Sequence, residues 1–292
     1  MAFKAERYFY NSREKRLYFA SVTGEEPNNH ALLFCHGFAD HSNRFLETAE
    51  WFADNGVDVF LFDLEGHGQS EGISGELIPL ENLVLDLRQF VIESNASGQY
   101  ESVFAAGHGL GAILWTHLIN RKDFDPQIDG LLMLGPTLKT SYQVPRVIQE
   151  MSRYISSVSP NLPVMGMKEE FMCRDEKAQN AYLEDPLVYH GKIKAHVAAV
   201  LVEAGKKALL VADELTVPTW IGHGSDDKFA SVQGARKFME SLTVENREMH
   251  IYPGFYHDLL HDHDKLSVLE DMLRWIRMVS PVIEKVTDLE DA

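Results

Sequence analysis

Two kinds of hydrophobic pattern alternate along most of the chain. Short uninterrupted apolar runs are typical of strands covered on both faces, and segments whose apolar residues recur every three or four positions are typical of helices. The expected strands are residues 31–35, 57–63, 103–106, 131–134, 217–222 and 248–252, and the expected helices are residues 45–53, 80–91, 110–120, 235–242 and 266–279. This alternation predicts an α/β fold with a mostly parallel central sheet and helices on both faces.

Two aromatic-rich segments precede this pattern. Residues 7–11 and 17–22 flank a polar turn at residues 12–14. Such an arrangement predicts an antiparallel hairpin at one edge of the sheet.

The pattern changes between residues 137 and 214. Helical spacing is clear at residues 144–158 and again at 193–210, residues 159–166 are broken by prolines, and no strand is obvious. We expect a helical cap here, inserted between a first core segment (residues 1–136) and a second one (residues 215–292). Three methionines of the cap suit an apolar surface that adapts to an acyl chain, or else fill the joint between cap and core. They are Met165, Met167 and Met172.

Composition narrows the class of protein. Among the 292 residues, 45% are hydrophobic and 24% are charged, as in soluble globular proteins. The net charge of −17 disfavours nucleic acid and anionic surfaces as partners. No apolar run approaches the roughly 18 residues of a membrane span, and the start of the chain does not resemble a signal peptide, so we expect a cytoplasmic protein. Two cysteines indicate neither a disulfide framework nor a zinc site.

The stretch of residues 103–114 predicts a strand, a tight glycine-rich reversal and the start of a helix. The reversal reads Gly107, His108, Gly109, Leu110 and Gly111, which matches the G-x-S-x-G nucleophile elbow except that glycine replaces the serine. The outer glycines make room for a turn packed between sheet and helix. The central residue of such an elbow normally has a strained backbone, which a glycine relieves.

Together these motifs resemble the monoglyceride lipase and lysophospholipase branch of the α/β-hydrolases over nearly the full length of the chain. The matching segments are residues 36–44, 62–63, 66–72, 107–111, 223–227 and 256–257. The resemblance implies an α/β-hydrolase fold and hydrolysis of a carboxylic ester with one acyl chain, without cofactor or metal. The implied partner is a small acyl ester, of monoacylglycerol or lysophospholipid type, with transient membrane contact through the cap as a further possibility.

The resemblance also assigns catalytic roles. Gly109 stands at the nucleophile position, His257 is the general base, and Asp227 orients it, with Asp226 as the alternative acid. The backbone amides of Phe38 and Leu110 form the oxyanion hole, where each donor contributes about 3–4 kcal/mol to transition-state stabilisation.

We call the turn that carries Phe38 the oxyanion turn. Polar residues near it complete the expected site. The substrate-binding candidates are His36, Gly37, Arg44 and His108. Arg44 either contacts the polar head of the substrate or pairs internally with Asp40, and the histidines are expected to bond the backbone of nearby loops.

A cluster of histidines and aspartates lies near the end of the chain. The spacing of His257 and His261 makes a metal site a weaker alternative, because no H-E-x-x-H motif accompanies them. Asp258 is expected at the surface or as a loop cap.

Three hypotheses about activity remain open from the sequence. The chain is a serine ester hydrolase whose nucleophile has been replaced, and is therefore inactive. Alternatively it is a natural pseudo-hydrolase that binds an acyl or other apolar ligand beneath the cap. A third hypothesis is slow catalysis in which His257 directs water at the carbonyl, from which we expect no useful turnover.

Overall fold

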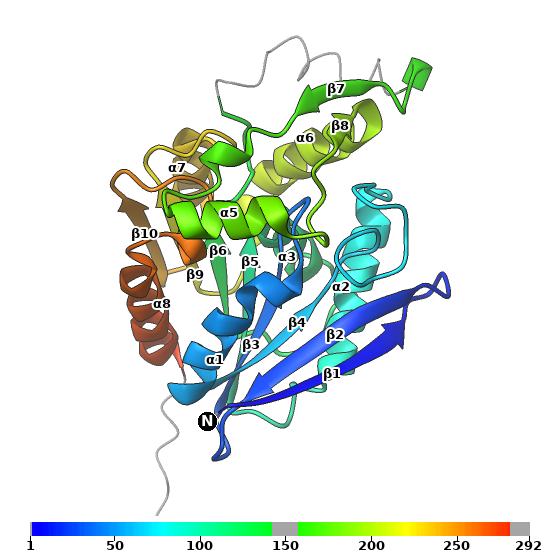
Figure 1. Ribbon diagram of the computed structural model, residues 1–292. Helices are drawn as coiled ribbons and strands as arrows, with labels where there is room; N and C mark the ends of the chain where they lie inside the picture. Colours follow the sequence, from blue (N-terminus) through cyan, green and yellow to red (C-terminus); the bar gives the residue numbers. More distant parts are fainter. Residues whose placement is uncertain (1, 142–156, 281–292) are drawn as a thin grey trace, which may run out of the picture.

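The computed structural model describes residues 2–141 and 157–280, and within them eight strands form one sheet in the order β1-β2-β4-β3-β5-β6-β9-β10 (Figure 1). The strands are β1 (Phe3–Tyr10), β2 (Arg16–Thr23), β3 (His30–Cys35), β4 (Val57–Phe62), β5 (Ser102–His108), β6 (Gly130–Leu134), β9 (Thr219–Gly224) and β10 (Arg247–Tyr252). β2 is antiparallel to β1 and β4, and the other neighbouring pairs are parallel. The predicted mostly parallel sheet with an edge hairpin is confirmed.

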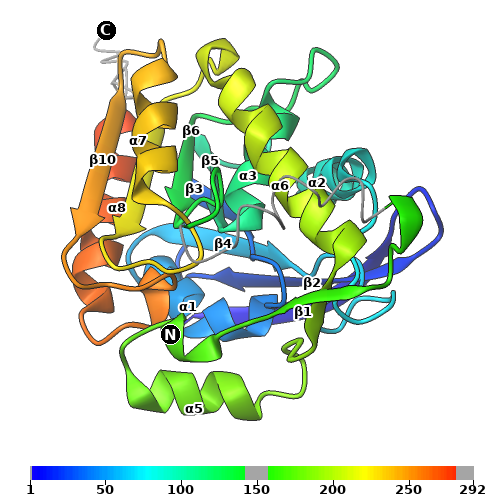
Figure 2. The same ribbon diagram turned by 90° about the horizontal axis from the view of Figure 1, so that it is seen from above.

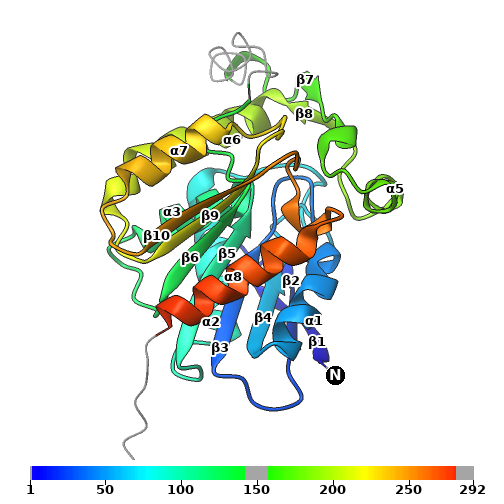
Figure 3. The ribbon, with the colours of Figure 1, turned by 90° about the vertical axis from the view of Figure 1, so that its left-hand side faces the viewer.

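Helices cover both faces of this sheet. The core helices are α1 (Leu46–Asp54), α2 (Leu80–Ser94), α3 (Leu110–Ile119), α7 (Val232–Ser241) and α8 (Lys265–Val279). α1 and α8 lie on the same side of the sheet (Figure 3), where Phe52 and Trp275 belong to one apolar cluster. α2, α3 and α7 supply the cluster on the opposite face. The two-sided apolar strands between them therefore explain the uninterrupted apolar runs of the sequence.

The largest boundary error lies in the edge hairpin. β1 begins at Phe3, four residues before the predicted start, and most of its side chains are exposed. An exposed edge strand buries no face, so it carries no alternating pattern to mark where it begins. The helix after β3 also differs slightly, since it opens with a 3₁₀ turn over Ser42–Phe45.

We call the segment between β6 and β9 the insertion, and its described part crosses the carboxyl ends of the strands (Figures 1 and 2). Its described elements are β7 (Pro163–Gly166), a 3₁₀ turn (Glu169–Phe171), α5 (Glu176–Glu184), β8 (Lys192–Lys194), α6 (Ala195–Leu210) and a second 3₁₀ turn (Ala212–Glu214). α6 packs against α3 of the core. The helix predicted over residues 144–158 lies outside the described residues, except for its last two positions.

The prediction that the insertion lacks strands is wrong. β7 and β8 pair as a short antiparallel ribbon. These strands are too short, and too rich in proline and lysine, to produce a readable alternation. α5 was also missed, because it buries Tyr182 and leaves most of its other residues exposed or half-buried. Within the described part of the chain, no helix is both long and apolar enough to cross a membrane.

Candidate active site

The elbow joins the carboxyl end of β5 to the first turn of α3. Gly109 has φ +54° and ψ −110°, a backbone conformation that L-residues rarely adopt. A Cβ atom on Gly107 or Gly111 would overlap the backbone of Ala112 or Cys35, respectively. The two outer glycines are therefore required by close packing between the elbow, the helix and β3.

The middle glycine is different, because the space around it is open. A Cβ atom built on Gly109 would lie 3.4 Å from His257 Nε2, and the next nearest atom, Gly37 Cα, would be 3.8 Å away. A serine would therefore meet no collision at this position. Its hydroxyl would point into the space in front of the imidazole.

His257 and Asp227 form a buried pair behind this space. His257 Nδ1 lies 2.7 Å from Asp227 Oδ2, while Asp227 Oδ1 accepts from the backbone N–H groups of Phe229 and Ala230 at 2.7 and 2.9 Å. Burial alone would lower the pKa of His257, but the facing carboxylate outweighs it and raises that pKa above its ordinary value. Asp226 is exposed and bonds the Ser225 hydroxyl instead. The geometry thus pairs the imidazole with the second of the two aspartates.

Two backbone amides flank Gly109 at the candidate oxyanion hole. Phe38 follows the turn after β3, and Leu110 is the first residue of α3; both line the cavity beside Gly109. The amide of Leu110 belongs to the first helical turn, whose N–H groups have no acceptor within the helix and lie at the positive end of its dipole. These amides suit an anionic oxygen that forms next to the elbow.

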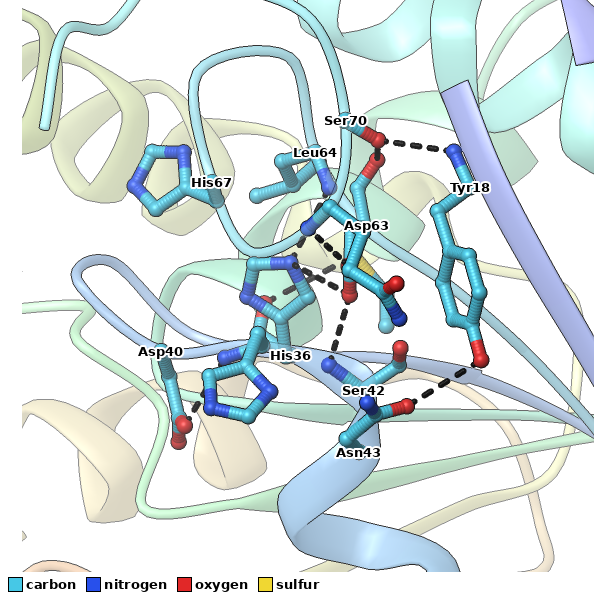
Figure 4. A network of polar contacts seen from close by, with 12 residues as sticks. Tyr18, His36, Asp40, Ser42, Asn43, Asp63, Leu64, His67 and Ser70 are labelled. Atoms are coloured by element: carbon cyan, nitrogen blue, oxygen red, sulfur yellow. Dashed lines mark hydrogen bonds and ion pairs between the residues drawn. The ribbon is translucent and has the colours of Figure 1, made fainter. Parts of the chain in front are cut away.

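His36 hydrogen-bonds the backbone at the oxyanion turn and at the loop after β4 (Figure 4). Its Nδ1 donates to the Gly37 carbonyl at 2.7 Å, and its Nε2 accepts from the Leu64 amide at 3.0 Å. Asp63 binds the same region through the Ser42 amide at 2.7 Å. Burial lowers the pKa of His36 to about 4, so the ring is neutral at neutral pH. It does not line the cavity.

His108 and Gly37, two of the substrate-binding candidates, line the cavity. The His108 ring lies against that of His257, with 4.6 Å between ring centroids, and its Nε2 is 3.4 Å from the His257 carbonyl oxygen. Burial lowers the pKa of His108 to about 4. A neutral His108 adds no positive charge that would compete with protonation of His257.

Arg44 lies behind the cavity and is not among its lining residues. Its guanidinium pairs with Asp40 at 2.9 Å and Asp258 at 3.1 Å, stacks 4.6 Å from the centroid of the Tyr182 ring, and is 8% exposed. Although burial opposes ionisation, Arg44 holds the pKa of Asp40 below its usual value. Of the two expectations for this residue, the structure has the internal ion pair.

Asp258 is buried rather than at the surface, so that part of the prediction is wrong. It caps a 3₁₀ turn (Leu259–His261) by accepting from the Leu260 amide, and it also pairs with Arg44 and with His261. The loop-cap alternative is confirmed. His263, in turn, pairs with Asp175 of the insertion. The histidines behind the metal alternative thus face separate partners, and the described residues contain no group of three ligands placed to hold a metal ion.

A largely apolar cavity of about 110 Å³ lies beside Gly109, between the core and the insertion. Besides the residues already named, the described lining comprises Thr137, Thr140, Met165, Met167, Met172, Ile193, Leu201 and Phe229. All three methionines that the sequence singled out are therefore on the cavity wall. Sequence reasoning missed the other five, and of these only Ile193 and Leu201, both in the segment predicted as helical, carried a usable signal.

The insertion also bonds both loops that carry candidate catalytic groups. The Tyr189 amide donates to the carbonyl of Ala39, which follows Phe38 and has φ +65°, at 3.1 Å. The Asp258 amide donates to the Met172 carbonyl at 2.7 Å, directly after His257. The insertion therefore contacts the oxyanion turn on one side of Gly109 and the histidine loop on the other.

Comparison with known proteins places this geometry in a family. The family model described as serine aminopeptidase, S33, matches residues 26–264. A monoacylglycerol lipase of Mycolicibacterium smegmatis is 26% identical, with 94% of this chain and 97% of that protein covered. A monoglyceride lipase homolog of Monkeypox virus is 31% identical, with 84% and 89% covered.

Solved structures agree on the fold. A soluble variant of monoglyceride lipase from Saccharomyces cerevisiae, in complex with a substrate analog, has a TM-score of 0.82 and 19% identity, covering 94% of this chain and 95% of that one. The monoacylglycerol lipase of Paleococcus ferrophilus has a TM-score of 0.78 and 22% identity, covering 96% and 100%. Motifs, fold and matched length together show that the chain belongs to the monoglyceride lipase-like α/β-hydrolases of the S33 serine hydrolase family.

Proposed function

We propose that this protein is built on a monoacylglycerol-type ester hydrolase site whose nucleophile position is occupied by Gly109, so that it binds an acyl ester without forming an acyl-enzyme. The observation that carries the proposal is the orientation of the His257 ring. Its Nε2 lies 3.4 Å from the place where the Cβ of a residue 109 side chain would stand, and Asp227 holds the opposite ring nitrogen. A general base oriented in this way can activate a hydroxyl group that stands in front of it.

With serine at position 109, each remaining part would have a role in two-step acyl transfer. His257 takes the hydroxyl proton as the oxygen attacks the ester carbonyl, and the amides of Phe38 and Leu110 stabilise the oxyanion. The protonated imidazole then gives its proton to the leaving alcohol, and Asp227 stabilises the imidazolium meanwhile. Water, activated by the same histidine, releases the acid. No step requires a cofactor or a metal.

The apolar cavity supports a substrate with one acyl chain. Its methionine-bearing wall comes from the insertion, which we propose is a cap over residues 137–214 between two core segments, residues 1–136 and 215–292. Methionine side chains adapt to flexible apolar ligands. The protein charge of −17 disfavours anionic head groups, so a monoacylglycerol is preferred over an anionic lysophospholipid.

The test restores the nucleophile. The Gly109→Ser variant is assayed on p-nitrophenyl esters of several chain lengths and on a monoacylglycerol, beside the unchanged chain. Gly109→Ala is the matched control, because it imposes the same backbone strain without a hydroxyl. We expect turnover and fluorophosphonate labelling in the serine variant alone. A folded serine variant that neither reacts nor is labelled would contradict the proposal.

A second function, ligand binding by a natural pseudo-hydrolase, is favoured by the backbone of Gly109. A glycine at φ +54° relieves the strain of the elbow and leaves the cavity open. For this function, a fatty acid or monoacylglycerol binds the unchanged chain saturably, and a bulky Leu201→Trp substitution in the cavity wall weakens binding. Calorimetric titration measures this binding and would show no saturable heat if the cavity bound neither ligand.

A further inference from the structure

We propose that the chain with glycine at position 109 catalyses single-step acyl transfer from an ester to a small neutral nucleophile that carries its own proton, such as hydroxylamine or methanol. The nucleophile would stand beside Gly109, in front of His257. This inference rests on the proposed function, because it requires an acyl ester bound in the same cavity. It goes beyond that function because it assigns an activity to the chain that has no nucleophilic serine at position 109.

The space beside Gly109 admits a small molecule. Outside Gly109 and its chain neighbours, the three atoms nearest to the built Cβ position are His257 Nε2 at 3.4 Å, Gly37 Cα at 3.8 Å and His257 Cε1 at 3.9 Å. A free nitrogen or oxygen atom must keep van der Waals distance from Gly109 Cα, so it stands beyond the built Cβ position, on the side of His257 Nε2. There it can form a hydrogen bond of about 3 Å with Nε2.

The imidazole is oriented to accept a proton from that molecule. Asp227 faces Nδ1 at 2.7 Å and fixes the proton there, so the lone pair of Nε2 is directed at the space beside Gly109. Phe38 and Leu110, whose amides are the proposed oxyanion donors, line the same cavity. Both are backbone groups, so replacing serine with glycine removes neither donor.

The reaction balances without an added oxidant, reductant or metal. A nucleophile H–Nu attacks the carbonyl carbon of RCO–OR′ as its proton passes to Nε2, which gives a tetrahedral oxyanion bonded to both amides. The C–OR′ bond then breaks, and the alkoxide takes the proton from Nε2. The products are RCO–Nu and R′OH, and His257 returns to its starting form.

Charge and size select the nucleophile. An anion brings no proton for Nε2, and the carboxylate of Asp227 behind the imidazole disfavours a further negative charge in front of it. The bound leaving group still occupies the exit side of the carbonyl. Small neutral molecules that are stronger nucleophiles than water are therefore accepted, whereas azide and longer alcohols are poor acceptors.

The experiment incubates the full chain with monodecanoylglycerol and measures decanoyl hydroxamate after addition of hydroxylamine, or methyl decanoate after addition of methanol. The unchanged chain is compared with Gly109→Ala, whose methyl group fills the space, and with His257→Ala, which has no base. Circular dichroism and thermal melting establish that each variant is folded. We expect transfer at least about tenfold above both variants, because a positioned general base contributes about a hundredfold or more to such a step.

Equal rates in the unchanged chain and in His257→Ala would overturn the inference. If Gly109→Ala does not fold, the unchanged chain is given methanol and butanol at equal concentrations. A ratio of methyl to butyl ester well above one supports binding of the nucleophile in the small space beside Gly109, and a ratio near one refutes it. Transfer to azide as fast as to hydroxylamine would also refute it. Gly109→Ser separates the two proposals: if that variant hydrolyses the ester and the unchanged chain transfers nothing, only this inference fails, whereas a silent Gly109→Ser variant contradicts the proposed function.

Discussion

Restoring serine at position 109 is expected to make the protein less stable. Gly109 has φ +54° and ψ −110°, and a non-glycine residue in such a region costs about 1–3 kcal/mol. The new side chain adds little steric cost, because its Cβ stands 3.4 Å from the nearest atom. Replacing glycine also restricts the unfolded chain, which returns about 0.4–1 kcal/mol. Taking the middle of each range, the net loss is about 1.3 kcal/mol.

This loss is measurable by urea unfolding and calorimetry. Unfolding entropies of about 2.1 cal/mol/K per residue give roughly 0.6 kcal/mol/K for 292 residues, so Tm should fall by about 2–3 °C. Gly109→Ala should show the same decrease, because the strain belongs to the backbone and not to the hydroxyl. Gly98→Ala, at φ +84° in an exposed loop, tests positive φ away from the site. The reasoning is refuted if both substitutions at position 109 leave stability equal or higher.

Three further predictions concern the residues around the elbow. In a chain with the serine restored, Asp227→Asn should lower kcat by about 10⁴-fold, while Asp226→Asn leaves it unchanged; steady-state assays decide which carboxylate acts. Because the general base must be neutral and the pKa of His257 lies above its ordinary 6.5, kcat/KM of the restored chain should rise with pH through a value above 6.5. A pH profile with no such rise above that value would contradict the pairing. Arg44→Met removes the guanidinium shared by two buried carboxylates, leaving Asp258 only its contact with His261, and should lower the free energy of unfolding measured in urea by about 3–5 kcal/mol. Arg88→Met, at a more exposed ion pair, should change stability by less than about 1 kcal/mol.

The sequence predicted the central sheet and the elbow well because both depend on local patterns. Strands such as β5 are buried on both faces and therefore appear as unbroken apolar runs. The elbow is equally local, since the need for Gly107 and Gly111 arises from contacts within one strand–turn–helix unit and its neighbouring strand. The preference for Asp227 came from the family pattern, and in the structure Asp227 Oδ2 lies 2.7 Å from His257 Nδ1.

What the sequence could not predict depends on partners distant in the chain. Asp258 is buried because Arg44, 214 positions away, lies against it, and nothing in the local sequence reveals that ion pair. The ribbon of β7 and β8 joins two very short segments across the insertion. The cavity wall likewise combines residues from distant segments, such as Phe229 and the methionines of the insertion.

The hydrogen bonds from Tyr189 to Ala39 and from Asp258 to Met172 have a consequence for how such proteins diversify. An insertion that touches only substrate can be exchanged between relatives as an independent module. Here the exchanged segment would also have to present a main-chain donor to the turn of Phe38 and a main-chain acceptor to the loop of His257. Tyr189 further requires glycine at positions 75 and 191, because a Cβ atom at either would overlap its ring. Grafting a foreign insertion to change chain-length preference would therefore require its two anchoring loops to be transferred with it.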